Sequence, residues 1–168
     1  MKLTVILHNI RSVHNVGSIF RTADGVRAEK IYLCGITPTP LGRFGNIRPD
    51  LAKVALGAER SVPWEYAKST MAAVKKLKKE GYRIFALEQA AGSVDIGSSA
   101  LRIPLSGSCL ILGDEIRGLP PSILKLADRI LEIPMRGRKE SLNVSVAFGI
   151  AAYAFLKKDE QAKNGKGH

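Results

Sequence analysis

The sequence predicts an α/β protein, with a mostly parallel sheet that carries helices on both faces. Short apolar runs alternate along the chain with longer segments of helical pattern, which is the order expected of strand–helix units. The short runs are continuously apolar, and this is typical of strands that are buried on both faces. The chain has 168 residues, enough for one domain with its own core.

Five strands and four helices are expected. The predicted strands are residues 3–7, 30–34, 83–87, 109–113 and 129–133. The predicted helices are residues 17–26, 66–80, 121–127 and 142–156. Gly81 follows the second of these helices and suits a helix C-terminus, whereas Pro121 suits the first turn of the third.

Residues 1–157 are expected to form a single domain. Residues 158–168 lack large apolar side chains and are expected to be a polar, flexible tail. The Gly- and Pro-rich segment 35–49 follows a predicted strand, and loops of this length in compact domains are usually functional or disordered.

The chain is strongly basic, with 26 Lys and Arg against 15 Asp and Glu and a net charge of +11. Such a surface attracts polyanions, either nucleic acid or an acidic membrane. The alternative is a soluble protein that is basic without a polyanionic partner.

Several classes of protein and site are disfavoured by the sequence. Cys34 and Cys109 lie in apolar runs, so they are expected in the core and not in disulfides or a metal site. No apolar stretch suits a signal peptide or a membrane span, which favours the cytoplasm and no membrane partner. The glycine-rich phosphate loop, the dinucleotide fingerprint and the nucleophile elbow are all absent from the sequence.

Polar or glycine-rich stretches follow three of the predicted strands. They begin at Glu88, Gly113 and Pro134. Because ligands of open α/β sheets bind at the carboxyl ends of the strands, we expect these stretches to form one ligand site.

Two polar segments have both a structural and a functional interpretation. Ser141, Asn143 and Ser145 open an apolar helix, so they either cap it or face a ligand, since buried polar groups need partners. Asn15 either caps a helix or belongs to a site, and Arg21 either lies on a solvated helix face or acts in that site.

Three segments together resemble the ordered motifs of the SpoU/TrmH family of RNA ribose 2′-O-methyltransferases, in the SPOUT superfamily. They are NVGSIFR at residues 15–21, LGDEIRGL at 112–119 and IPMRGRKESLNVS at 133–145. Asp114 departs from the family pattern, in which Asn, Ser or Thr is common at this position.

The resemblance implies a SPOUT-type α/β knot, in which the carboxyl-terminal segment forms a trefoil knot. It also implies a homodimer with active sites at the subunit interface, and S-adenosylmethionine as the cofactor. No metal ion is expected, because the sequence has no metal-ligand cluster. The residues expected to hold the cofactor are Leu87, Glu88, Gly113, Ile133, Met135, Ser141, Leu142 and Asn143.

The same resemblance implies four catalytic residues, which are Arg21, Asn15, Glu115 and Asn143. An arginine stays protonated in proteins, so Arg21 is expected to hold a phosphate and to stabilise alkoxide charge, and not to act as a base. Asn15 would orient Arg21 or the ribose, Glu115 would organise the motif loops and could pair with Arg117 or Arg21, and Asn143 would bind near the acceptor oxygen.

Basic residues outside the pocket are expected to bind the RNA backbone. These are Arg11, Arg43, Arg48, Arg136, Arg138 and Lys139. The lysine-rich run 75–79 has two equal interpretations, a second RNA contact or a solvated helix face.

The leading functional hypothesis is methyl transfer to a ribose 2′-hydroxyl of tRNA or rRNA, with tRNA favoured because no recognition domain is appended. The alternatives are a SPOUT enzyme that methylates bases and a catalytically inactive RNA-binding scaffold. S-adenosylmethionine binding measured by calorimetry, followed by methyl transfer to bulk tRNA and rRNA, would distinguish an enzyme from the inactive scaffold.

Overall fold

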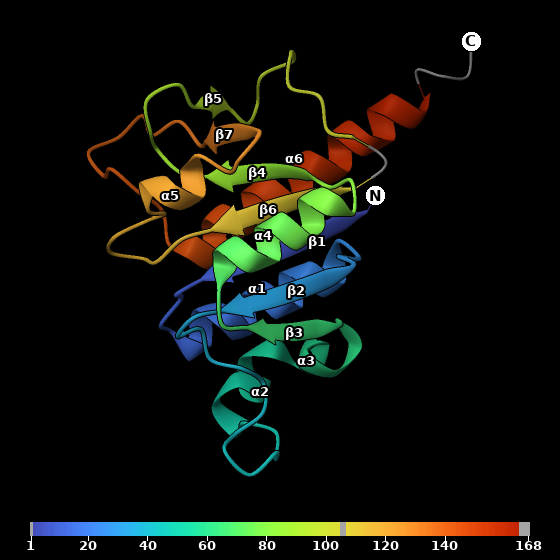
Figure 1. The fold of residues 1–168 in the computed structure, drawn as a ribbon, viewed down its shortest axis with the longest axis vertical. Coiled ribbons are helices and arrows are strands. Elements are labelled where there is room, and N and C mark those ends of the chain that lie inside the picture. Colours follow the sequence, from blue (N-terminus) through green and yellow to red (C-terminus); the bar gives the residue numbers. More distant parts are fainter. Residues whose placement is uncertain (1, 105–106, 165–168) are drawn as a thin grey trace.

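The computed structural model describes residues 2–104 and 107–164, and in this part of the chain seven strands form one sheet (Figure 1). The order across the sheet is β3-β2-β1-β6-β4-β7-β5, and the pairings between these strands are parallel. The strands are β1 (Leu3–His8), β2 (Lys30–Cys34), β3 (Trp64–Ala67), β4 (Arg83–Leu87), β5 (Val94–Asp95), β6 (Ser108–Leu112) and β7 (Arg129–Glu132). The mostly parallel α/β fold predicted from the sequence is therefore confirmed.

Helices cover both faces of the sheet because successive side chains of a strand point to opposite faces. The helices are α1 (Val13–Gly25), α2 (Pro49–Ala55), α3 (Ala58–Ser61), α4 (Thr70–Lys79), α5 (Pro121–Leu124) and α6 (Val144–Asn164). Phe85 of β4 packs on the side of α1 and α6, where its ring meets that of Phe155 edge-on with the centroids 5.2 Å apart. Ile84 and Ala86 belong to the second core cluster, beneath α4 and α5.

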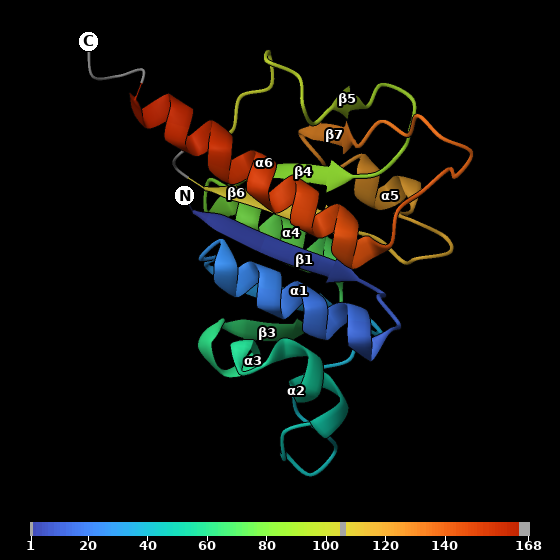
Figure 2. The same ribbon diagram turned by 180° about the vertical axis from the view of Figure 1, so that it is seen from behind.

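The two faces are seen separately in the two ribbon views. Helices α4 and α5 lie in front of the sheet in Figure 1, whereas α1 and α6 lie in front of it in Figure 2. Helix α6 follows β7 along the chain but packs beside α1, so the chain returns across β4 and β6 to reach it.

The five predicted strands are all present, with ends that shift by at most one residue. Two short strands, β3 and β5, were not predicted, and residues 66–67 belong to β3 and not to the following helix, which begins at Thr70. Helix α1 begins earlier than predicted, because Ser12 caps it by accepting a hydrogen bond from the backbone N–H of Asn15 at 3.2 Å. Both cysteines are buried, as expected, and burial raises the pKa of Cys34 to about 11.

The expectation of a flexible tail from residue 158 is wrong for residues 158–164. Helix α6 continues to Asn164, since this stretch contains good helix formers and no proline or glycine. Lys158 Nζ donates a hydrogen bond to the carbonyl of Ser98 at 2.7 Å, and Asp159 is only 2% exposed. Residues 165–168 lie outside the described part of the chain.

Candidate active site

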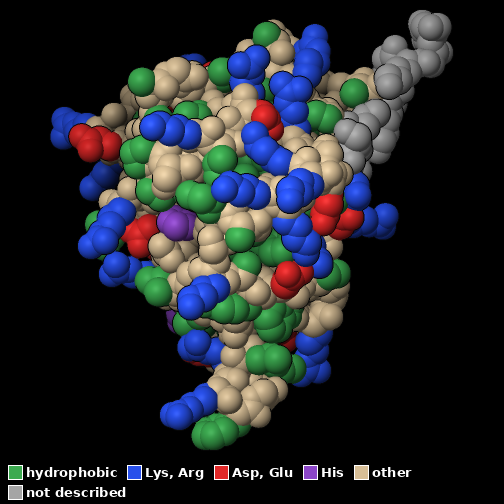
Figure 3. Space-filling view, viewed as in Figure 1, with side chains coloured by type: hydrophobic (Ala, Val, Ile, Leu, Met, Phe, Trp, Pro, Cys, Tyr) green, Lys and Arg blue, Asp and Glu red, His purple; other side chains and the backbone are tan. Residues whose placement is uncertain are grey.

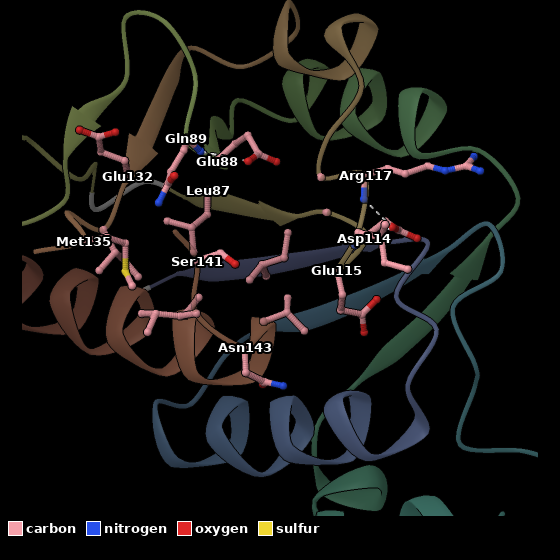
Figure 4. Close-up of a pocket in the computed structure, with 18 residues that line it drawn as sticks. Leu87, Glu88, Gln89, Asp114, Glu115, Arg117, Glu132, Met135, Ser141 and Asn143 are labelled. Atoms are coloured by element: carbon pink, nitrogen blue, oxygen red, sulfur yellow. Dashed lines mark hydrogen bonds between the residues drawn. The ribbon is translucent and has the colours of Figure 1, made fainter. Parts of the chain in front are cut away.

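A cavity of about 540 Å³ opens at the carboxyl ends of β4, β6 and β7 (Figure 4). Its walls come from the three polar stretches that follow these strands, together with the first turn of α6. Pockets for small molecules and cofactors are typically about 300–1,000 Å³. The eight residues expected to hold a cofactor all line this cavity: Leu87, Glu88, Gly113, Ile133, Met135, Ser141, Leu142 and Asn143.

A tight turn after β6 forms one wall, and two glycines make it possible. A Cβ atom added to Gly113 would lie 2.5 Å from the backbone carbon of Gly118 and 2.7 Å from the backbone nitrogen of Leu119. Gly118 has φ of +65°, and a Cβ there would lie 2.3 Å from Glu88 Oε2. The same Oε2 accepts a hydrogen bond from the backbone N–H of Leu119 at 2.8 Å, so Glu88 fixes the turn from the neighbouring strand.

Asp114 shapes this turn from within. Its Oδ1 accepts hydrogen bonds from the backbone N–H groups of Ile116 at 2.9 Å and Arg117 at 2.8 Å, and its Oδ2 lies 3.3 Å from Arg11 Nε. Burial raises the pKa of Asp114, but these N–H groups and the charges of Arg11 and Arg117 outweigh it, so the pKa lies below its ordinary value. Arg117 itself points away from the cavity in Figure 4.

A chain of hydrogen bonds connects three segments that are far apart in the sequence. Asn15 Nδ2 donates to Glu115 Oε1 at 3.0 Å, and Asn143 Nδ2 donates to Asn15 Oδ1 at 3.1 Å. The backbone N–H of Arg11 also donates to Glu115, at 3.3 Å. Three of the four predicted catalytic residues therefore form one network at the edge of the cavity.

Asn143 also answers the question raised by the polar start of α6. Its Oδ1 accepts from the backbone N–H of Ser145 at 2.9 Å and from Ser145 Oγ at 2.7 Å, so it caps the helix. Its amide nitrogen remains directed at Asn15, and Ser141 lines the cavity. The structural interpretation therefore holds for Asn143, which caps α6 and also lines the cavity, whereas Ser145 supports Asn143 and does not line the cavity.

Arg21 is the predicted catalytic residue that the structure does not bring to the cavity. It is exposed on α1, farther along the helix than Asn15, and it is not among the residues that line the cavity. The expectation that Glu115 pairs with Arg117 or Arg21 is wrong, because Glu115 binds Asn15 and the backbone of Arg11 instead. Asn15 likewise orients Glu115 and Asn143, and it is not the N-cap of α1.

Sequence reasoning missed several residues that line the cavity. Gln89 lies beside Glu88, and its Nε2 donates to the carbonyl of Glu140 at 2.7 Å, which ties the loop after β4 to the loop before α6. Glu132 lines the cavity from the end of β7, and Val144 and Ala147 from the start of α6. All four follow from the same rule that located the site, since each lies at the end of a strand or in the first turn of the helix.

The basic residues expected to bind RNA fall into two groups. Arg43, Arg136, Arg138 and Lys139 are exposed on loops. Arg11 and Arg48 are engaged by carboxylates, with Arg48 Nη2 lying 2.8 Å from Asp50 Oδ2. In the lysine-rich run on α4, Lys76 and Lys78 pair with Glu65 and Asp128, which favours the solvated helix face for these two lysines.

His8 lies at the end of β1, close enough to the turn after β6 for the charge of Asp114 to affect its pKa. Asn9 Nδ2 donates to His8 Nε2 at 3.2 Å, which leaves Nδ1 to donate to Thr70 Oγ1 at 2.7 Å and suits a neutral ring. Burial lowers the pKa of His8, and the charge of Asp114 partly offsets this effect.

We therefore expect Asp114→Asn to lower the pKa of His8 further, measured by NMR titration of the ring resonances. The pKa of His8 is lower in the folded chain than in the unfolded chain, so the unfolded chain binds a proton at His8 first as the pH falls. The free energy of unfolding should therefore decrease as the pH falls below about 6.5. A higher His8 pKa in the variant would contradict this account.

Comparison with known proteins decides the family. The model of the SpoU rRNA Methylase family matches residues 2–153. The chain belongs to this family. A SpoU family relative, the tRNA (guanosine(18)-2′-O)-methyltransferase of Escherichia coli K12, is 31% identical over 160 residues, which cover 95% of this chain and 65% of that protein.

Solved structures agree with this assignment. The AdoMet-bound rRNA methyltransferase from Sinorhizobium meliloti superposes with a TM-score of 0.83 at 28% identity, over 93% of this chain and 56% of that chain. A structure described as giving insights into the 2-OH methylation of C/U34 on tRNA has a TM-score of 0.76 at 28% identity, over 95% of this chain and 97% of that chain. This SpoU family chain spans less than two thirds of the length of the first curated relatives, such as 62% of an Archaeoglobus fulgidus tRNA/rRNA methyltransferase.

Among the residues that the structure describes, the His, Cys, Asp and Glu side chains form no group of three or more that could hold a metal ion. None of their helices combines the length and the apolar character needed to cross a membrane.

Proposed function

We propose that this SpoU family member transfers a methyl group from S-adenosylmethionine to a ribose 2′-hydroxyl of tRNA or rRNA, with tRNA favoured. The observation that carries the proposal is the Glu115–Asn15–Asn143 network beside a nucleoside-sized cavity, which joins the three motif segments. The relatives support it, because the E. coli protein is named for 2′-O-methylation of a tRNA and the S. meliloti protein binds AdoMet.

The residues of the cavity suit the proposed cofactor. Leu87, Ile133 and Leu142 offer apolar surfaces to an adenine ring, and the backbone at Gly113 can approach a ligand closely. Glu115 and Glu132 lie on the walls and suit a cationic sulfonium and ribose hydroxyls. The bound cofactor would supply a methyl group that is already an activated electrophile.

The residues of the protein would then position the acceptor ribose. Asn143, held by Asn15 and by its own cap to α6, would present its amide near the acceptor oxygen. Glu115 would keep Asn15 in place. Arg21 would bind the phosphate beside the target ribose and stabilise the developing alkoxide.

A homodimer is proposed because a stripe of α6 is apolar and exposed. Val146 is 51% exposed, Ile150 42% and Tyr153 55%, and their spacing places them on one side of the helix. Arg21 lies exposed on α1, which packs beside α6, so pairing through these helices would carry Arg21 toward the partner's cavity. We also propose the trefoil knot, which the return of the chain from β7 to α6 suits. We further propose a cytoplasmic location and a single domain that extends through α6.

The direct test is methyl transfer from labelled S-adenosylmethionine to unmodified tRNA and rRNA, with a metal chelator present. Digestion to nucleosides and mass spectrometry would show whether the added methyl group is on the ribose or on the base. Asn143→Ala serves as the inactive control. Methyl groups found only on bases would establish the base-methylating alternative, and binding without transfer would establish the RNA-binding scaffold.

RNA binding should weaken steeply with salt, because each neutralised phosphate changes the slope of log K against log salt by about −0.7 to −0.9. Arg43→Ala and Lys139→Ala should each reduce the slope by about one such unit and leave cofactor affinity unchanged. Arg27→Ala is the matched control, since it removes the same charge between α1 and β2, at the opposite edge of the sheet from the cavity. Fluorescence anisotropy across a salt series measures this, and equal slopes for all three variants would contradict the assignment.

A further inference from the structure

The connection between β2 and α2 ends in an ordered hairpin. The backbone N–H of Gly42 donates to the carbonyl of Asn46 at 2.8 Å, and that of Gly45 donates to the carbonyl of Gly42 at 3.0 Å. Leu41 and Ile47 form an antiparallel bridge at its base. The tip, residues 42–46, is therefore held in one conformation by its own backbone.

Phe44 stands at this tip and is 91% exposed, the largest value among the large hydrophobic side chains described. The adjacent Gly45 has no side chain that could cover the ring. It has φ of +78°, and a Cβ added there would meet nothing within 4 Å, so the space beside Phe44 is open. A phenyl ring left in water forgoes the favourable free energy that burial would give. A rigid turn that presents such a ring suits a partner that covers it on binding.

The charge around Phe44 indicates what kind of partner this is. Residues 35–48 include Arg43 and Arg48 and no Asp or Glu. Arg48 is held by Asp50, whereas Arg43 is exposed and has no ion-pair partner among the described residues. An aromatic ring beside a free arginine is the combination that binds single-stranded nucleic acid, because the ring stacks on a base and the arginine binds the backbone.

The place of the hairpin indicates which step of the reaction it serves. In Figure 3 it is the projection at the bottom of the view, and it ends in a hydrophobic side chain beside a basic one. The ribbon views place this projection beside α2, on the other side of β1 from the three strands that carry the cavity. A contact there would reach a nucleotide away from the reacting ribose.

We propose that Phe44 stacks on an unpaired nucleobase of the substrate RNA while Arg43 binds an adjacent phosphate. The proposal rests on the proposed function and deepens it, because it assigns as substrate an RNA with an unpaired segment at a fixed distance from the methylated ribose. Phe44 is a recognition residue and does not take part in the chemical step.

The first experiment compares Phe44→Ala, Phe44→Leu and Phe44→Trp in the methyl-transfer assay. Alanine and leucine should raise KM for RNA roughly 5- to 100-fold, which is the range for loss of one stacked base, and leave kcat within about twofold. Tryptophan should restore KM, since only an aromatic ring stacks. Leu56→Ala is the matched control, because Leu56 is 65% exposed at the C-terminal end of α2, outside the hairpin, and this variant should behave as the wild type.

The second experiment measures stacking without turnover. Trp64 is the only tryptophan, so Phe44→Trp combined with Trp64→Phe places a single indole at the tip. A single-stranded RNA should quench its fluorescence, whereas a fully paired duplex of the same length should not.

The outcomes separate this proposal from the proposed function. If the wild type methylates RNA and Phe44→Ala leaves KM unchanged, the stacking role is overturned and the enzyme assignment stands. If no RNA is methylated, the proposed function fails, whereas quenching by single-stranded RNA would still support the stacking role. A change of oligomeric state in Phe44→Ala, seen by sedimentation, would instead make the hairpin an interface between copies and overturn the proposal.

Discussion

Replacing Gly113 with alanine should lower the affinity for S-adenosylmethionine at least tenfold. The added methyl group would lie 2.5 Å from the backbone of Gly118, and no rotation of a side chain can relieve a contact with backbone. The turn must therefore move, although Glu88 and Asp114 hold it through backbone hydrogen bonds. Overpacking of this kind costs about 1–3 kcal/mol, and Tm should fall by about 2–4 °C for each kcal/mol.

Gly137→Ala is the matched control for this prediction. Gly137 lies in the loop before α6, and a Cβ atom there would meet nothing within 4 Å. Isothermal titration calorimetry with S-adenosylmethionine and a thermal melt compare the two variants. Equal affinities would show that the turn after β6 does not shape the cofactor site.

Replacing Arg21 with alanine should remove most of the turnover and change cofactor affinity by no more than a few fold. Arg21 does not line the cavity, so the cofactor site keeps its residues, whereas contacts made only in the transition state are lost. Single-turnover rates and calorimetry measure the two effects. A large loss of cofactor affinity in Arg21→Ala would contradict this division of roles.

The position of Arg21 also leads us to expect that it serves the cavity of the partner subunit. Mixing Arg21→Ala with Gly113→Ala should then restore activity at an S-adenosylmethionine concentration that leaves the Gly113→Ala cavity largely empty. In the proposed homodimer, a heterodimer of the two variants contains one cavity of normal shape that faces an intact Arg21. Recovery should reach at most about half the activity of a wild-type dimer. A substitution of Leu142 would also alter the cavity, but Leu142 is 37% exposed and adjoins the apolar stripe of α6, so its replacement could disturb the proposed dimer. Gly113 is therefore preferred as the position of the cavity variant.

This experiment requires that the subunits exchange, which tagged subunits and co-purification would establish. With exchange shown, no recovery of activity would assign Arg21 to the cavity of its own subunit.

Five of the seven strands could be predicted from the sequence because they contain apolar runs. Four of these, β1, β2, β4 and β6, are largely buried, whereas β7 buries only Leu131. Strand β3 escaped prediction because it is short and half-exposed, with no apolar run to mark it. Helices α2 and α3 were not predicted either, because both are short and each buries only two of its residues.

The candidate site could be predicted from the sequence only in part. Its location followed from the rule that ligands bind at the carboxyl ends of parallel strands, and its residues followed from the family motifs. The partners of Asn15 did not, because the hydrogen bonds to Glu115 and Asn143 join residues 100 and 128 positions apart. Only the folded chain shows which polar groups such distances bring together.

Those same distances determine when the site can exist during protein synthesis. Asn15 leaves the ribosome early, but Glu115 follows β6 and Asn143 follows β7, so both of its partners emerge late. Helix α1 can pack against α2 and α3 soon after it is made, whereas the side chain of Asn15 waits for Glu115 and Asn143 for most of translation. If the proposed function holds, the protein cannot methylate the RNA of the ribosome that is making it until Asn143 has been released and has met Asn15.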